Sequence, residues 1–176
     1  MKVGAFTRRF LVPHFLITVI YYFKFGCFVS AKAEVELSPL LTIGKRTKIS
    51  AFCKIKATRG PVRIGADVSI ATSCFITGAP GGLEIGDSSH VGPSSTILSG
   101  NFGVASFDVP FDRQPRTSKG TRIGRNVLIG ANCVILDGST IGDGVIVSPG
   151  SVVSGRIESN TVVQGNPAKV IFRRRA

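Results

Sequence analysis

The sequence predicts an all-β solenoid whose coils have three short sides. Isoleucine or valine recurs at every sixth residue, a spacing that fits neither the helical period of about 3.6 nor the strand period of about 2. The composition, with 21 Gly, 9 Pro and no Trp, favours turns and strands over helices. The repeated positions are Ile43, Ile49, Ile55, Ile64, Ile70, Ile76, Ile85, Val91, Ile97, Ile123, Ile129, Ile135, Ile141, Val147 and Val153.

The spacing of these residues groups them in threes. Within a triplet the step is six residues, whereas the first three triplets are separated from one another by steps of nine. Between Ile97 and Ile123 the step is 26 residues. The extra residues always enter at the same junction. We therefore expect three hexads to form one coil of 18 residues, with one corner that accepts insertions.

Two further positions of each hexad fit such a coil. The residue four places after each aliphatic should be a second, smaller inward residue. These residues are Thr47, Cys53, Val68, Cys74, Ser89, Ser95, Val127, Cys133, Ser139, Val145 and Ser151. The residue three places after the aliphatic should turn the corner with left-handed backbone, which Gly and Asn tolerate best. In the second half of the chain these residues are Asn126, Asn132, Gly138, Gly144 and Gly150.

The cysteines fit packing better than chemistry. Cys53, Cys74 and Cys133 fall on the small inward position, which predicts a role in the core. Cys27 lies outside the repeat and stays unassigned. No C-x-x-C spacing occurs, so the sequence predicts no metal site.

The net charge of +12 on 176 residues points to an acidic partner: nucleic acid, anionic lipid or a phosphorylated substrate. A basic stretch with no acidic residue runs from Lys45 to Arg63, and Arg173, Arg174 and Arg175 lie near the end of the chain. No aromatic residues interleave these basic runs in the manner of single-strand binding, so we expect no nucleic acid partner. A basic surface that is merely solvated remains the simple alternative.

The N-terminal part has a different character. Residues 10–29, FLVPHFLITVIYYFKFGCFV, are mostly apolar but contain Pro13, His14 and Lys24. The uninterrupted apolar part is shorter than a membrane span of about 20 residues. Basic residues flank it at Lys2, Arg8, Arg9 and Lys24. The pattern predicts a helix lying in a membrane interface. A helix capping the open end of the coil, or a signal peptide cleaved near SAKA at 30–33, are the alternatives.

The repeat and two motifs resemble the hexapeptide-repeat acyltransferase superfamily, and within it the bacterial sugar O-acetyltransferases of polysaccharide and lipopolysaccharide synthesis. The motifs are TSKGTRIGRNVLIGANCVILDGSTIGDGV and VVQGNPAKVIFRR. The resemblance implies a left-handed parallel β-helix, a homotrimer, and acetyl-CoA bound in the groove between neighbouring chains. It divides the chain into an N-terminal segment 1–36, a β-helix 37–165 with an insertion loop 99–122, and a basic tail 166–176.

The resemblance also assigns site residues. Family members carry an Asn-His pair in the insertion, where the His is the general base, but this chain has Asn101 and Phe102. His90 is the substitute candidate for the base, because the three-sided register places it outward beside Leu128, and Asn101 is the other catalytic candidate. The cofactor groove would include Leu128, Ala131, Pro149 and Lys169. The substrate loop would include Phe102, Asp112, Arg113, Ser118 and Lys119. Family members usually have Trp at the position of Leu128 and a residue with an N–H at that of Pro149.

The resulting functional prediction is an acetyl-CoA-dependent O-acetyltransferase for a sugar hydroxyl of a cell-surface polysaccharide or a lipid-linked saccharide. One alternative is a catalytically impaired trimeric scaffold. Another is a nucleotide-sugar N-acyltransferase that uses His90. Because CoA is used in the cytoplasm, we expect a cytoplasmic protein, with peripheral contact to the anionic inner face of the cytoplasmic membrane.

Overall fold

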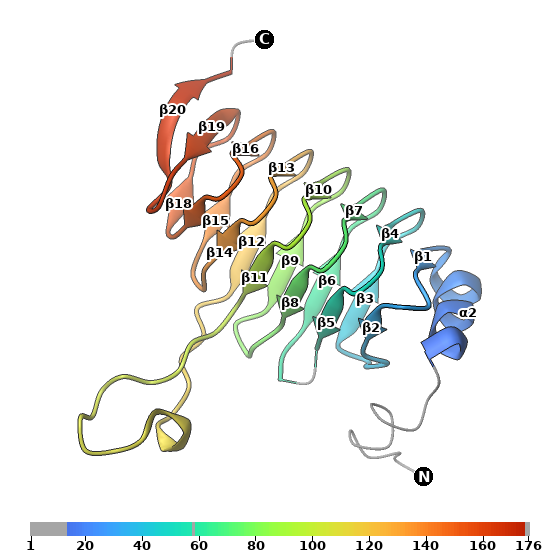
Figure 1. Cartoon of the computed structure of the whole chain (residues 1–176), viewed down its shortest axis with the longest axis horizontal. Coiled ribbons are helices and arrows are strands. Elements are labelled where there is room, and N and C mark those ends of the chain that lie inside the picture. Colours follow the sequence, from blue (N-terminus) through green and yellow to red (C-terminus); the bar gives the residue numbers. More distant parts are fainter. Residues whose placement is uncertain (1–13, 58, 175–176) are drawn as a thin grey trace.

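A computed structural model describes residues 14–57 and 59–174 of the chain. The predicted basic residues Lys2, Arg8, Arg9 and Arg175 lie outside these residues, as does the start of the apolar segment. The described part is a left-handed parallel β-helix, as predicted, with one helix at its N-terminal end and a long projecting arm (Figure 1). Successive coils stack along one axis, and each coil contributes one short strand to each of three sheets.

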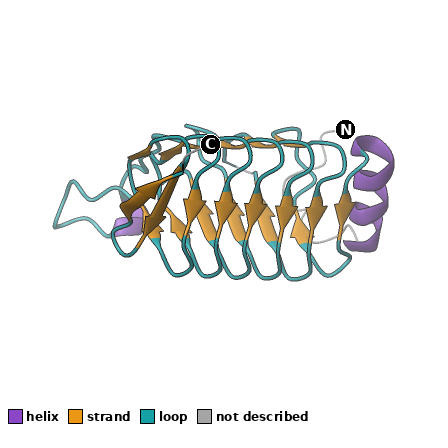
Figure 2. Ribbon diagram, turned by 90° about the horizontal axis from the view of Figure 1, so that it is seen from above, coloured by secondary structure: helices purple, strands orange, loops and turns teal. Residues whose placement is uncertain are grey.

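Three sheets form the sides of the prism, and Figure 2 shows strands of successive coils aligned in rows. Sheet A contains β1 (Phe28–Val29), β4 (Lys48–Ile49), β7 (Ser69–Ile70), β10 (His90–Val91), β13 (Leu128–Ile129), β16 (Ile146–Val147), β19 (Thr161–Gln164) and β20 (Lys169–Arg173). Sheet B contains β2 (Glu34–Val35), β5 (Lys54–Lys56), β8 (Phe75–Thr77), β11 (Thr96–Leu98), β14 (Val134–Ile135) and β17 (Val152–Val153). Sheet C contains β3 (Leu41–Ile43), β6 (Val62–Ile64), β9 (Leu83–Ile85), β12 (Thr121–Ile123), β15 (Thr140–Ile141) and β18 (Arg156–Ile157).

The core lies inside the prism and follows the predicted repeat. Every repeated Ile and Val is at most 4% exposed, and every residue of the second inward position is at most 2% exposed. The strands pair in parallel and in register, so identical repeat positions stack on one another, as Ile76 does on Ile97 and Ile97 on Ile135. The solenoid begins earlier than the repeat indicated, because Val29 and Val35 already occupy inward positions on β1 and β2.

The corners adopt the left-handed backbone that the sequence predicted. Asn126, Asn132, Gly138, Gly144 and Gly150 all have positive φ values. The same position in the earlier coils is also left-handed, although it holds residues that the sequence did not mark as corner formers. These residues are Arg46, Phe52, Asp67, Ser73, Ser88 and Ser94. The stacking of coils therefore imposes this conformation even where the side chain does not favour it.

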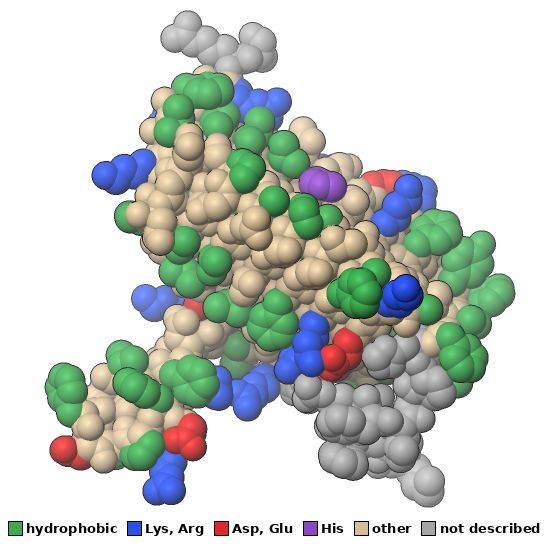
Figure 3. Space-filling view, in the orientation of Figure 1, with side chains coloured by type: hydrophobic (Ala, Val, Ile, Leu, Met, Phe, Trp, Pro, Cys, Tyr) green, Lys and Arg blue, Asp and Glu red, His purple; other side chains and the backbone are tan. Residues whose placement is uncertain are grey.

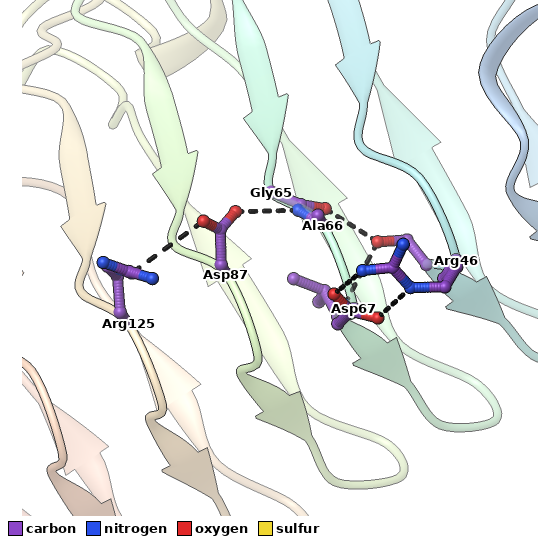
Figure 4. A network of polar contacts seen from close by, with 8 residues as sticks. Arg46, Gly65, Ala66, Asp67, Asp87 and Arg125 are labelled. Atoms are coloured by element: carbon purple, nitrogen blue, oxygen red, sulfur yellow. Dashed lines mark hydrogen bonds and ion pairs between the residues drawn. The ribbon is translucent and has the colours of Figure 1, made fainter.

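Side chains tie the corners of successive coils together (Figure 4). One corner of the prism joins the strands of sheet C to the following strands of sheet A. At this corner the Asp87 carboxylate accepts a hydrogen bond from the backbone N–H of Ala66 at 2.8 Å and forms an ion pair with Arg125 at 3.8 Å. At the same corner the Arg46 guanidinium donates to both carboxylate oxygens of Asp67. We call this the CA corner, and name the AB and BC corners in the same way.

The helix α2 (His14–Phe25) covers the N-terminal end of the solenoid (Figure 1). Its Ile17 and Tyr21 side chains are buried in the common core, and the Tyr21 hydroxyl donates to the Glu36 carbonyl at 2.8 Å. Burial raises the pKa of Tyr21 above its ordinary value. One side of α2 therefore caps the end of the solenoid, as in one of the three alternatives for this segment. None of the described helices is long and apolar enough to cross a membrane.

Candidate functional site

The long insertion leaves the solenoid at the BC corner. β11 ends at Leu98 and β12 begins at Thr121, and the chain between them forms an arm that projects away from the coils (Figure 1). The shorter insertions of the two preceding coils lie at the same corner, between β5 and β6 and between β8 and β9. This arrangement confirms that one corner accepts all the extra residues.

The neck of the arm is a two-stranded bridge. Asn101 and Thr117 pair in antiparallel fashion, with hydrogen bonds of 2.8 Å from the Asn101 N–H and 3.1 Å from the Thr117 N–H. The Ser118 hydroxyl donates to the Ser99 carbonyl and accepts from the N–H of Gly81. The neck is thus anchored to its own coil and to the coil before it.

The arm ends in a tip that carries exposed apolar side chains. A short 3₁₀ turn, η1 (Phe111–Arg113), lies at this tip. Gln114 is buried beneath it, donating to the carbonyls of Ser106 and Val109 and accepting from the Ser106 N–H. Val104, Phe107 and Phe111 are between 65% and 104% exposed. The tip therefore holds its shape through its own hydrogen bonds and presents an apolar surface.

A pocket of about 450 Å³ opens at the base of the arm. It combines the last residues of three sheet B strands with the first residues of the insertion. The lining residues are Lys56, Arg59, Phe75, Thr77, Gly78, Leu98, Gly100, Asn101, Phe102 and Arg116. We call this the arm pocket. Its size is in the range of sites that hold small molecules.

The arm pocket is cationic and aromatic. Three of its side chains, Lys56, Arg59 and Arg116, are positively charged, and none of the described residues that line it is acidic. The Arg116 guanidinium lies 3.8 Å from the centroid of the Phe102 ring, and the Lys56 ammonium lies 5.7 Å from that of Phe75. Such a lining suits a ligand with a phosphate or diphosphate group next to an apolar or ring-shaped part.

The catalytic candidate Asn101 and the predicted substrate-loop residues fall in three different places. Asn101 and Phe102 line the arm pocket. Asp112 and Arg113 lie in η1 at the exposed tip. Ser118 and Lys119 lie in the neck, where the Lys119 N–H donates to the Asp137 carboxylate at 3.0 Å. Within one chain, the structure therefore brings only the first pair to the pocket.

His90 and the predicted cofactor residues lie on other surfaces. His90 is exposed on sheet A, paired with Leu128, which in turn pairs with Ile146. This register confirms the predicted juxtaposition of His90 and Leu128. Ala131 and Pro149 lie at the AB corner of two successive coils, where the Ala131 carbonyl accepts a hydrogen bond from the Gly150 N–H. Lys169 begins β20 and is exposed.

Sequence reasoning missed Lys56, Phe75 and Arg116 as pocket residues. The repeat itself carried a signal for Lys56, because Lys56, Thr77 and Leu98 follow each other in register at steps of 21 residues. Because the insertion begins directly after Leu98, this register indicates that Lys56 lies at the corner from which the arm leaves. Arg116 comes from the returning strand of the arm, whose path no repeat defines.

The cysteines have the predicted packing role. Cys53, Cys74 and Cys133 are at most 1% exposed on the inward column of the AB corner. Cys74 is hydrogen-bonded to Cys53 and buried, and both effects raise the pKa of its thiol. Burial raises the pKa of Cys27 to about 11. Among the described residues no cluster of His, Cys, Asp and Glu could hold a metal ion.

Comparisons with known proteins agree with the repeat and the fold. Residues 120–155 match the family model described as bacterial transferase hexapeptide (six repeats). No curated protein sequence matches the chain significantly. Residues 120–155 therefore match the hexapeptide repeat, and the chain has the left-handed β-helix fold.

Three solved structures illustrate the likeness. A point mutant of AntD, an N-acyltransferase from Bacillus cereus in complex with dTDP and coenzyme A, aligns with a TM-score of 0.77 and 22% identity over 89% of this chain and 88% of AntD. The acetyltransferase domain of PglB from Neisseria gonorrhoeae, in complex with acetyl coenzyme A, aligns with a TM-score of 0.63 and 21% identity over 83% of this chain and 58% of the PglB chain. PerB from Caulobacter crescentus, in complex with CoA and GDP-perosamine, aligns with a TM-score of 0.62 and 20% identity over 84% of this chain and 58% of the PerB chain.

Proposed function

We propose that this protein transfers an acyl group from an acyl-CoA thioester to a sugar that carries a phosphate or diphosphate group, and that the arm pocket binds this acceptor. The observation that carries the proposal is the lining of the pocket, with three cations, two aromatic rings and no acid among the described residues. The three solved structures described above are complexes with CoA or acetyl-CoA, and two of them also contain a nucleotide or nucleotide sugar. Acetyl-CoA is the donor predicted from the sequence.

An amino group is the acceptor that the arm pocket favours. A hydroxyl needs a base to remove its proton during attack, and the described lining offers neither a carboxylate nor an imidazole. An amine is a nucleophile in its neutral form, and the nearby positive charges of Lys56, Arg59 and Arg116 oppose its protonation. The C–N bond forms as the C–S bond breaks, and the proton lost by nitrogen leaves with CoA as the thiol. This preference differs from the hydroxyl acceptor expected from the sequence.

A homotrimer is supported by the difference between the three sheets. The outward positions of sheet C are all polar or charged, namely Thr42, Arg63, Glu84, Arg122, Thr140 and Arg156. Sheet A instead presents Leu128 and Ile146 in its later coils, beside the polar Ser69 and His90. Sheet B presents Phe75, Val134 and Val152. Packing sheet A of one copy against sheet B of the next would bury these apolar side chains and leave sheet C in water.

The AB corner would then lie on the three-fold axis, and Phe52 supports this placement. This phenylalanine is 65% exposed and left-handed, with a φ of 61°. A bulky residue in this conformation costs about 1–2 kcal/mol relative to Gly. Strain of this kind is retained where it serves a contact, and three Phe52 rings would meet on the axis.

In such a trimer the second candidate, transfer to a sugar hydroxyl, would have a base. His90 begins β10 next to the CA corner, and Lys56, Thr77 and Leu98 end their strands next to the BC corner. Both positions lie at the outer edges of the sheets that would face each other. His90 of a neighbouring copy would stand beside the arm pocket at the level of Asn101. Leu128, which pairs with His90, would lie along the same groove, whereas the predicted donor residues Ala131 and Pro149 stand at the AB corner, near the proposed axis.

Thiol release from acetyl-CoA tests the proposal. We expect release with the amino sugar UDP-glucosamine well above that with UDP-glucose. Arg116→Gln should raise the KM for UDP-glucosamine by roughly tenfold or more and leave that for free glucosamine unchanged, since only the former offers phosphate. His90→Asn should leave the amine reaction unchanged.

Other results would select another function. Turnover of UDP-glucose that falls about 10²-fold in His90→Asn supports the hydroxyl reaction. If acetyl-CoA shows no binding by calorimetry, the acyltransferase proposal is wrong, and the scaffold expected as an alternative from the sequence is the better description.

A further inference from the structure

The helix α2 exposes an apolar surface on the side that does not face the solenoid core. Six of its side chains are between 37% and 81% exposed, namely Phe15, Leu16, Val19, Ile20, Tyr22 and Phe23. Phe28 extends this surface, since its ring lies 5.5 Å from that of Tyr22. Figure 3 shows apolar side chains gathered at this end of the molecule. We call these seven residues the cap surface. A contiguous exposed patch of this kind marks a contact with a partner or a membrane.

Positive charge surrounds the cap surface. Lys24 lies in the last turn of α2, Lys45 packs over Gly26 directly after the helix, and Lys48 pairs with Phe28 in sheet A. Neither Lys45 nor Lys48 forms an ion pair with another described residue. These lysines are therefore available to an anionic partner next to the apolar side chains.

We propose that the cap surface docks this protein on an anionic lipid bilayer, with α2 lying in the interface. The helix has 12 residues and a length of about 18 Å, well below the hydrocarbon thickness of about 30 Å, so it would lie on the membrane instead of crossing it. Its exposed rings and aliphatic side chains enter the boundary between headgroups and acyl chains, and the lysines contact the headgroups.

Charge also decides against a second copy as the occupant. Two cap surfaces in contact would bring Lys24, Lys45 and Lys48 of one copy against the same residues of the other. Anionic lipid instead lowers the energy of every one of these charges. In the proposed cyclic trimer, all three cap surfaces lie at the same end, so a flat bilayer engages them together and gains avidity. The docking does not depend on the acyltransferase activity.

Vesicle sedimentation of the full chain tests the docking. We expect binding to vesicles of equal parts phosphatidylcholine and phosphatidylglycerol, and little binding to phosphatidylcholine alone. Phe23→Ser should weaken binding by roughly tenfold or more, because this ring is 81% exposed and would be buried in the interface. Lys45→Gln and Lys48→Gln should each weaken it by roughly fivefold.

Matched controls separate docking from general effects. Ile171→Ser removes an exposed apolar side chain from β20 at the opposite end, and Arg122→Gln removes one charge from sheet C, and both should bind like the parent. Equal binding of Phe23→Ser and the parent would overturn the proposal, as would equal binding to both vesicles. If the parent does not bind vesicles and Phe23→Ser changes the oligomer mass, a second copy covers the cap surface. That result would also overturn the docking proposal.

Discussion

Corner residues show how strongly the solenoid constrains single positions. The left-handed corner position holds Asn or Gly in the later coils but Arg46, Phe52 and Asp67 in the early ones. Asn and Gly adopt this conformation at little cost, whereas the other residues need compensation. Arg46 and Asp67 occupy this position in adjacent coils, so their side chains leave the same corner in the same direction and meet (Figure 4).

The Arg46–Asp67 contact makes stability depend on pH at the acidic end. The hydrogen bond from Arg46 holds the pKa of Asp67 below its usual value. Its stabilisation is therefore present above the unfolded pKa of about 3.9 and is lost as the pH falls through the lower folded value. Asp67→Asn keeps a residue that tolerates the corner. Its urea midpoint should lie slightly below that of the parent at neutral pH, and the gap should narrow as the pH falls below the unfolded value and Asp67 of the parent becomes protonated. A gap that is independent of pH would contradict this account.

The arm is the element whose structure depends least on the solenoid. All three side-chain hydrogen bonds of Gln114 go to other residues of the arm tip, so its contribution is local. The neck, by contrast, is tied to neighbouring coils through Ser118 and through Asp137. The arm pocket lies next to the neck, and the tip is free to contact another copy.

Gln114→Ala should loosen the tip without unfolding the coils. It leaves the carbonyls of Ser106 and Val109 and the Ser106 N–H without their partner, a local cost of about 1–3 kcal/mol. We expect faster cleavage within the arm in limited proteolysis, with a melting temperature within a degree or two of the parent. Arg113→Ala, an exposed neighbour, serves as the control and should cleave like the parent. A large drop in melting temperature would show that the arm supports the core.

At the scale of the whole molecule, assembly decides whether the groove exists. One chain leaves apolar side chains outward on sheets A and B, and keeps His90 and the arm pocket on different sheets. The proposed three-fold packing brings these features together. Function would then depend on the oligomer, because neither side of the groove is complete in a single copy.

Mass measurement in solution tests the assembly. Light scattering should give three times 18.6 kDa for the parent. Phe52→Asn should weaken the trimer, since it removes the three rings from the axis, and should stabilise the isolated chain by about 1 kcal/mol through relief of corner strain. Ser88→Asn, a similar corner change at the CA corner, should leave the mass unchanged. A monomeric parent would contradict both the trimer and the shared groove.

The spacing of the repeat is enough to predict the solenoid, its core and the corners of the later coils. These depend on local spacing, because a coil of fixed length stacks equal repeat positions on each other, so Ile97 must meet Ile76 and Ile135. The same spacing predicts that His90 lies beside Leu128, as the pairing of β10 with β13 shows.

The arm pocket and the orientation of α2, in contrast, depend on contacts between distant parts of the chain. The arm pocket joins Lys56 and Phe75 from two coils to Arg116 from the returning arm, and the arm has no repeat that fixes its path. Likewise, composition left α2 as either a cap or an interfacial helix, because apolar residues suit both environments equally. The structure buries Ile17 and Tyr21 and exposes Phe15, Val19 and Phe23, so one side of the helix caps the core while the other stays open. Which side is buried depends on the shape of the solenoid end, a property that no stretch of sequence contains alone.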